Sequence, residues 1–175
     1  MGRRSALNSR RLTYGPPGAT RPADPQWTPP RGFRSCERTV LVGRGDAAWE
    51  AATASLRAWG VKTRSGFTVE PPSVAREGGD HWLVASLGPF RVREPARIVA
   101  VVDLPDRQGY AYGTLEGHPV SGEEAFVLHR DGDGTVFFTL RSITRPGRGW
   151  WRWAFPGVLV AQRWYRARYL RALRV

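Results

Sequence analysis

The segment from Thr114 to Glu124 holds the side chains best suited to chemistry in this chain of 175 residues. It brings together a threonine, a histidine (His118) and two adjacent glutamates, with glycines between them. Neighbouring residues on a β-strand point to opposite faces of a sheet, so one glutamate should face a cavity and the other solvent. Glu124 shares its face with Phe126, so it is the inward one if that apolar side chain faces the core.

Two interpretations of this segment follow from the residue types. Burial raises the pKa of a carboxyl group and a neighbouring histidine opposes that shift, so such a pair can transfer protons near neutral pH. On this view His118 and Glu124 are the catalytic candidates. Alternatively, the glycines shape a long turn, and His118 and one glutamate hydrogen-bond its backbone. The sequence leaves both interpretations open.

The same segment resembles the signature of an uncharacterised "domain of unknown function" family. The shared pattern is G-T-L-x-G-H-x-x-x-G-E-E-x-F, which here runs from Gly113 to Phe126. The resemblance continues through TVLVGRG (39–45), the helix that contains Trp59, and DGDGTVFFTLRSITRP (131–146). It covers most of the chain from about Tyr14 onward, and the family name implies no activity.

The elements that must position these residues follow from the periodicity of the chain. A first strand is expected at Glu37–Val42, and Asp46 is a good N-cap for a helix that stops at Gly60. Six strands should follow: Phe67–Glu70, His81–Leu87, Arg97–Asp103, Gly109–Leu115, Glu123–Arg130 and Thr135–Ile143. A final helix is expected from Pro156 to Val175.

This order predicts an α+β domain with one curved antiparallel β-sheet of about seven strands wrapped on a long C-terminal helix. The order is similar to that of the helix-grip folds of the START and Bet v 1-like superfamily. This resemblance implies an apolar cavity between sheet and helix. We therefore expect a protein that binds an apolar or amphipathic small molecule. An acid–base enzyme of cyclase or isomerase type in the same cavity is the alternative. The predicted ligand-binding residues are Thr114, His118, Glu123 and Glu124 as polar anchors, with Trp59, Phe138, Tyr165 and Tyr169 as walls.

The charge of the chain suggests a third possibility. The net charge is +12, and it divides into +6 for residues 1–38, −3 for 39–140 and +9 for 141–175. Two basic ends favour a contact with nucleic acid or an anionic membrane. However, 26 of the 27 basic residues are arginine, so a general bias towards arginine explains much of this charge. A small-molecule partner is therefore preferred.

Several classes of site are excluded or disfavoured. One cysteine and three histidines disfavour a metal site, and no cofactor is expected. The G-x-G-x-x-A run at 43–48 is typical of dinucleotide binding, but no series of βα units follows it. The Asp131–Gly134 segment is a hairpin turn, since a calcium loop would need a glutamate at its twelfth position.

Residues 1–11 read as a disordered basic tail and residues 12–175 as one domain. With no signal sequence or apolar span, a cytoplasmic protein is expected.

One further segment, Gly149–Phe155, interleaves aromatic residues with arginine. Such a mixture suits stacking on bases or contact with a membrane interface. The preferred interpretation is that its rings close one end of the cavity, because tryptophans near a helix start are usually packed.

Overall fold

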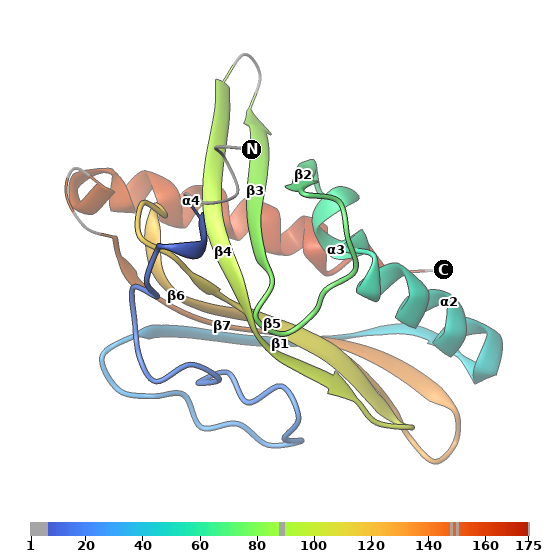
Figure 1. Ribbon diagram of the computed structural model, residues 1–175. Coiled ribbons are helices and arrows are strands. Elements are labelled where there is room, and N and C mark those ends of the chain that lie inside the picture. Colours follow the sequence, from blue (N-terminus) through green and yellow to red (C-terminus); the bar gives the residue numbers. More distant parts are fainter. Residues whose placement is uncertain (1–6, 88–89, 148, 150, 175) are drawn as a thin grey trace.

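A computed structural model describes residues 7–87, 90–147, 149 and 151–174 of the protein. Seven strands and the helices labelled α2 to α4 form its framework (Figure 1). In chain order the elements are β1 Arg34–Arg44, α2 Gly45–Arg57, α3 Gly60–Thr63, β2 Phe67–Glu70, β3 Asp80–Leu87, β4 Phe90–Asp103, β5 Arg107–Thr114, β6 Val120–Arg130, β7 Thr135–Pro146 and α4 Trp151–Tyr169.

The strands form a single antiparallel sheet in the order β1-β7-β6-β5-β4-β3-β2. Figure 1 shows the sheet strongly curved, with α2, α3 and α4 gathered on one side of it and the N-terminal segment running along the other. We call the helix-covered side the inner face and the opposite side the outer face. The hairpin turn predicted at 131–134 joins β6 to β7.

The main hydrophobic core lies between the inner face and the helices. α2 contributes buried residues such as Trp49 and Leu56, and the central strands contribute aromatic rings such as Phe126 and Phe138. A much smaller cluster, Ala111, Ala125 and Val127, lies on the outer face. Because side chains alternate along β6, Phe126 and Leu128 face inward together with Glu124, as the sequence indicated.

The predicted α+β helix-grip architecture is confirmed, with differences at the ends of elements. β4 begins seven residues before the predicted strand, because Pro95 is accommodated within it opposite Trp82. The predicted first helix corresponds to α2, which ends at Arg57, three residues before the expected stop at Gly60. The left-handed conformation of Trp59 (φ 61°) then turns the chain into α3, a short helix that was not predicted. α4 begins at Trp151 rather than at Pro156, which lies exposed inside the helix. It ends at Tyr169, and turns follow.

The predicted N-cap of the first helix is wrong. Arg44 occupies the cap position, without a side-chain hydrogen bond to the helix. Asp46 lies in the first turn instead, where its negative charge favours the helix N-terminus, and it accepts a hydrogen bond from Arg130.

The N-terminal segment packs on the domain from the first residues that the structure describes. Leu7 is buried, and the side chains of Arg10 and Arg11 both donate hydrogen bonds to Glu116. Residues 1–6 of the tail expected at 1–11 lie outside the described residues. None of the described helices combines the length and the apolar character needed to cross a membrane.

Candidate functional site

A partly open cavity of about 360 Å³ lies between the inner face of the sheet and α4, whose residues from Ala154 to Tyr169 border it. Apolar side chains from strands and helix form most of its surface, among them Val92, Val158 and Ala161. Ionisable residues also border it, among them Lys62, Glu94, His118, Glu124 and Tyr169. A mainly apolar cavity of this size with a few polar groups is typical of a small-molecule site.

Lys62 reaches the cavity because α2 ends in a sharp turn. The left-handed conformation of Trp59 redirects the chain into α3, and its ring packs on Tyr110 with the centroids 4.9 Å apart. Gly60 then passes so close to α2 that a Cβ atom there would lie 2.1 Å from Ser55 Oγ. This tight turn directs α3 against the sheet and buries Lys62, of which 2% is exposed.

The ammonium group of Lys62 is enclosed by partners. Its Nζ atom donates hydrogen bonds to Glu124 Oε2 at 3.0 Å and to the Tyr169 hydroxyl at 2.7 Å. It also lies 4.5 Å from the ring centre of Phe67 and 4.9 Å from that of Tyr112, where cation–π attraction adds to the ion pair. The positive charge of Lys62 is therefore already balanced within the protein.

The tyrosines of this cluster are neutral hydrogen-bond partners. Tyr112 donates a hydrogen bond to Glu124. Burial, followed by the negative charge of Glu124, holds the pKa of both Tyr112 and Tyr169 well above the usual value for tyrosine. Lys62 and the Tyr112 hydroxyl together fix the Glu124 carboxylate in place, and the Tyr169 hydroxyl holds Lys62.

Glu94 and His118 form a second polar group beside the first. His118 accepts a hydrogen bond at Nδ1 from the backbone N–H of Val120 at 3.1 Å, so the neutral ring carries its proton on Nε2. Burial first, and then the charge of Lys62, lowers the pKa of His118 to about 3, so the ring is neutral at physiological pH. Its Nε2 lies 3.7 Å from Glu94 Oε2, too far for a hydrogen bond.

The environment of Glu94 changes how readily its carboxyl group loses a proton. Burial raises its pKa to about 7, and the negative charge of Glu124 adds to the effect while Lys62 opposes it. Among the described residues, the Nε2 atom of His118 and the hydroxyl of Tyr165 are buried without a hydrogen-bond partner. The polar side of the cavity is therefore incompletely satisfied.

Glu123 faces the opposite way from Glu124. It was expected to face solvent, but the N-terminal segment covers the outer face and leaves Glu123 only 2% exposed. Its carboxylate accepts hydrogen bonds from the backbone N–H groups of Gly18 (2.8 Å), Ala19 (3.2 Å) and Thr20 (2.8 Å). The hydroxyl groups of Tyr14 and Thr20 donate two more. Glu123 borders the cavity only from the reverse side of β6, and its carboxylate anchors the N-terminal segment.

Two glycines of the signature have structural reasons. A Cβ atom at Gly113 would lie 2.5 Å from the Tyr14 hydroxyl, and one at Gly122 would lie 1.9 Å from the backbone oxygen of Ile143. Thr114 ties these two positions together, because its hydroxyl donates to the Gly122 carbonyl and accepts from the Gly122 N–H. Only glycine allows the N-terminal segment and β7 to approach so closely.

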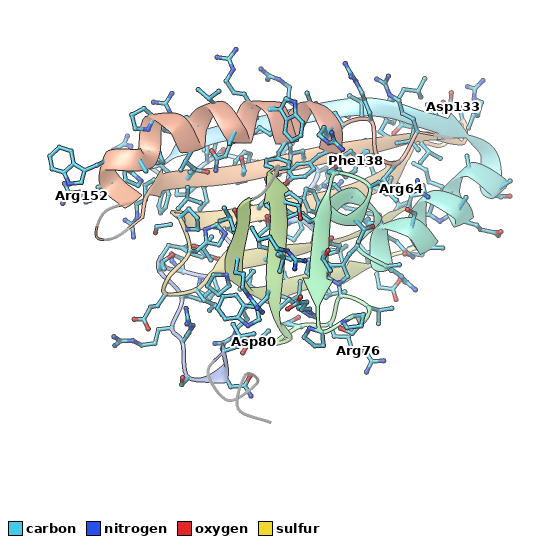
Figure 2. All side chains as sticks on the ribbon, turned by 90° about the horizontal axis from the view of Figure 1, so that it is seen from above. Arg64, Arg76, Asp80, Asp133, Phe138 and Arg152 are labelled. Atoms are coloured by element: carbon cyan, nitrogen blue, oxygen red, sulfur yellow. The ribbon has the colours of Figure 1, made fainter. Side chains whose placement is uncertain are left out.

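The remaining predicted site residues divide between cavity and core. Tyr165 and Tyr169 border the cavity, as do Thr114, His118, Glu123 and Glu124. Trp59 and Phe138, predicted as walls, lie in the core and do not border it. Figure 2 shows Phe138 among the packed side chains between strands and helices.

The predicted pairing of His118 with Glu124 is not what the structure contains. Glu124 is held by Lys62 and Tyr112, and the carboxylate beside His118 is that of Glu94. Glu94 escaped prediction because the predicted strand starts only at Arg97, whereas β4 starts at Phe90. Lys62 escaped it too, although it is the only lysine in a chain with 26 arginines, and that exception was a usable signal.

The aromatic segment before α4 does not close the cavity through Trp153, which is 90% exposed. The helix starts earlier than expected and turns this ring outward, while Ala154 lies on the cavity side. Arg152 projects at the same exposed end of α4 (Figure 2). Trp150 and the side chain of Trp151 lie outside the described part of the molecule.

The fold and the site together define a helix-grip protein with a cavity between sheet and helix and a buried polar cluster. No group of three or more His, Cys, Asp or Glu side chains is placed to hold a metal ion within the described ranges. Residues 13–172 match the family model described as "Domain of unknown function (DUF1990)", and the chain belongs to this family.

Known proteins support this assignment. A UPF0548 protein of Deinococcus radiodurans is 38% identical over 162 residues, which cover 85% of this chain and 78% of that protein. A UPF0548 protein of Arabidopsis thaliana is 30% identical over 122 residues, or 66% of this chain and 59% of that protein. The crystal structure of a hypothetical protein from Helicobacter pylori superposes with a TM-score of 0.54 at 11% identity, covering 93% of this chain and 96% of that one. This last likeness concerns the fold alone.

Proposed function

We propose that the protein binds an apolar or amphipathic small molecule in the cavity between the sheet and α4. The observation that carries this proposal is the cavity of about 360 Å³, which combines apolar walls with buried polar atoms that lack partners among the described residues. A buried polar atom without a hydrogen bond costs about 1–3 kcal/mol. Such atoms around an apolar space support the binding of a ligand that forms hydrogen bonds with them.

The two sides of the cavity would have different tasks. The apolar surfaces of Val92, Val158 and Ala161 would contact the body of the ligand. The polar side, which includes Glu94 and His118, would receive its polar group. Lys62 and Glu124 support this side, because their ion pair fixes a charged pair beside the cavity without leaving a net charge.

A neutral fluorescent probe tests the proposal directly. N-phenylnaphthylamine gains fluorescence in apolar sites, so we expect a saturable increase with the wild-type protein. The Ala161→Phe variant should bind at least about tenfold more weakly, because the added ring occupies the cavity. Ala51→Phe, on the exposed side of α2, is the matched control and should bind as the wild type does. No saturable binding to the wild type, or equal binding to Ala161→Phe, would contradict the proposal.

The second candidate function is acid–base catalysis on a bound ligand, now with Glu94 in place of Glu124. It is favoured by the pKa of Glu94, raised to about 7, because a general base works best when its pKa is near the working pH. The neutral His118 would then donate a hydrogen bond to the developing oxygen anion of a ketone.

Proton exchange separates catalysis from binding alone. In D₂O, an enzyme of this kind should accelerate deuterium uptake at the carbon next to the carbonyl of tetralone, an apolar ketone, as followed by NMR. Glu94→Gln should abolish the acceleration while leaving probe binding intact. Exchange at the buffer rate with the wild-type protein would exclude this candidate and leave the binding proposal standing.

A further inference from the structure

The polar side of the cavity contains a donor and an acceptor that face each other without bonding. The donor is the Nε2–H group of His118, fixed as the proton-bearing nitrogen by the hydrogen bond that Nδ1 accepts from Val120. The acceptor is the carboxyl group of Glu94, whose Oε2 lies 3.7 Å away. His118 is only 7% exposed, and its Nε2 atom has no hydrogen-bond partner among the described residues.

A ligand group that completes this pair needs both an acceptor and a donor on the same atom. A hydroxyl group has this combination, since its oxygen accepts from an N–H group while its hydrogen bonds to a carboxylate. The separation of 3.7 Å lets one oxygen atom contact both partners. An ammonium group offers no acceptor for His118, and a carboxylate offers no donor for Glu94.

The charges around this pair disfavour a charged head group. Among the described residues that border the cavity, Lys62 is the only buried cation, and Glu124 Oε2 at 3.0 Å already neutralises it. An anionic ligand would therefore place its charge beside Glu94 and Glu124 without a free cation to balance it. Burying an uncompensated charge costs several kcal/mol, which is more than a pair of neutral hydrogen bonds returns.

We propose that the ligand is an apolar molecule with an uncharged hydroxyl group, and that this hydroxyl accepts a hydrogen bond from His118 Nε2 and donates one to Glu94. This inference rests on the proposed binding function and specifies the chemistry of its ligand. The rest of the ligand contacts the apolar walls, and Glu94 and His118 distinguish it from hydrocarbons of the same shape.

A set of naphthalenes substituted at the same ring position tests this by calorimetry. Naphthol carries the hydroxyl, methylnaphthalene has nearly the same shape without it, and naphthoate and naphthylmethylammonium carry opposite charges. The wild type should bind naphthol about tenfold more tightly than methylnaphthalene, as expected for one net hydrogen-bond contribution, and should bind both charged probes more weakly still.

Two variants locate the preference. Glu94→Met removes the acceptor, and His118→Asn removes Nε2 while its amide oxygen replaces Nδ1 as the partner of the Val120 N–H group. Each should bind naphthol and methylnaphthalene about equally, with the affinity for methylnaphthalene retained. Glu50→Met, on the exposed face of α2, is the control and should keep the wild-type preference. Circular dichroism and thermal unfolding establish that each variant is folded.

The outcomes distinguish this inference from the binding proposal. Equal affinity of the wild type for naphthol and methylnaphthalene, or tightest binding of either charged probe, overturns the hydroxyl assignment and leaves the cavity as a binding site. A preference for naphthol that survives in Glu94→Met also overturns it. Failure of the wild type to bind the naphthalenes and N-phenylnaphthylamine alike overturns both.

Discussion

The side chains of two adjacent residues, Glu123 and Glu124, lie on opposite faces of the sheet, in two differently organised regions of the molecule. On the outer face, Glu123 receives three backbone N–H groups and two hydroxyl groups from the N-terminal segment. On the inner face, Glu124 is paired with Lys62 and Tyr112 beside a cavity of about 360 Å³. The same residue type thus has a structural role on one face and lies at the candidate site on the other.

The difference lies in how completely Glu123 and Arg141 on one face, and His118 and Tyr165 on the other, satisfy their polar groups. Arg141, on the outer face, is buried and hydrogen-bonded, as Glu123 is. It pairs with Glu37 and donates to four carbonyl groups of the N-terminal segment. On the inner face, His118 and Tyr165 are buried with unused donors. Polar groups with full hydrogen bonding hold a fold together, whereas unsatisfied ones beside a cavity support the proposed binding of a ligand there.

The largest effect is expected from breaking the buried ion pair at the cavity. Lys62→Met should lower the free energy of unfolding by about 3–5 kcal/mol, because it leaves Glu124 buried without its cation. Denaturant unfolding monitored by circular dichroism measures the change. Adding Glu124→Gln to this variant should restore much of the loss, and an equally unstable double variant would show that the ion pair is not the cause.

Glu123→Gln should act on the outer face, with a loss of about 2–4 kcal/mol, since hydrogen bonds to a charged group are the strong ones and the new NH₂ group faces donors. The N-terminal segment should also become accessible to proteases between Tyr14 and Phe33, while probe binding in the cavity is kept. The exposed Glu50→Gln is the control. Loss of probe binding with an intact N-terminal segment would reverse the roles assigned to the two glutamates.

Glu94, on the inner face, should make the stability of the protein depend on pH. Because the pKa of Glu94 is raised from 4.5 to about 7 in the folded protein, the folded state holds a proton that the unfolded state releases first. Stability should therefore fall as pH rises from about 4.5 to 7, by up to roughly 3 kcal/mol, and level off above that. Glu94→Gln should remove this slope. An identical pH profile in the variant would show that Glu94 is not a buried acid.

The smallest effect is expected at Trp153. The ring is 90% exposed, so Trp153→Ser should change the unfolding free energy by less than about 0.5 kcal/mol and leave probe binding intact. Trp59→Phe, which alters a buried ring packed on Tyr110, is the contrasting variant and should be clearly destabilising. Comparable losses from both would place Trp153 in the packed structure.

The sequence predicted the architecture because strand alternation and the pattern of the last helix reflect burial on one face of each element. It also identified Glu124 as the inward glutamate from its parity with Phe126 and Leu128. It did not predict the cover over Glu123, because a proline- and glycine-rich segment without period gives no sign of where it packs. It missed Lys62, whose position depends on the left-handed turn at Trp59, and Glu94, which lies beside a proline that interrupts the strand pattern.

The central claim is that the cavity holds a small molecule, and native mass spectrometry of the gently purified protein tests it most directly. The wild-type protein should carry additional mass that disappears on denaturation, and Ala161→Phe, with its cavity filled, should be free of it. A bare wild-type mass, together with no mass gained on incubation with naphthol, would contradict the account. The cavity would then be only a packing defect beneath α4.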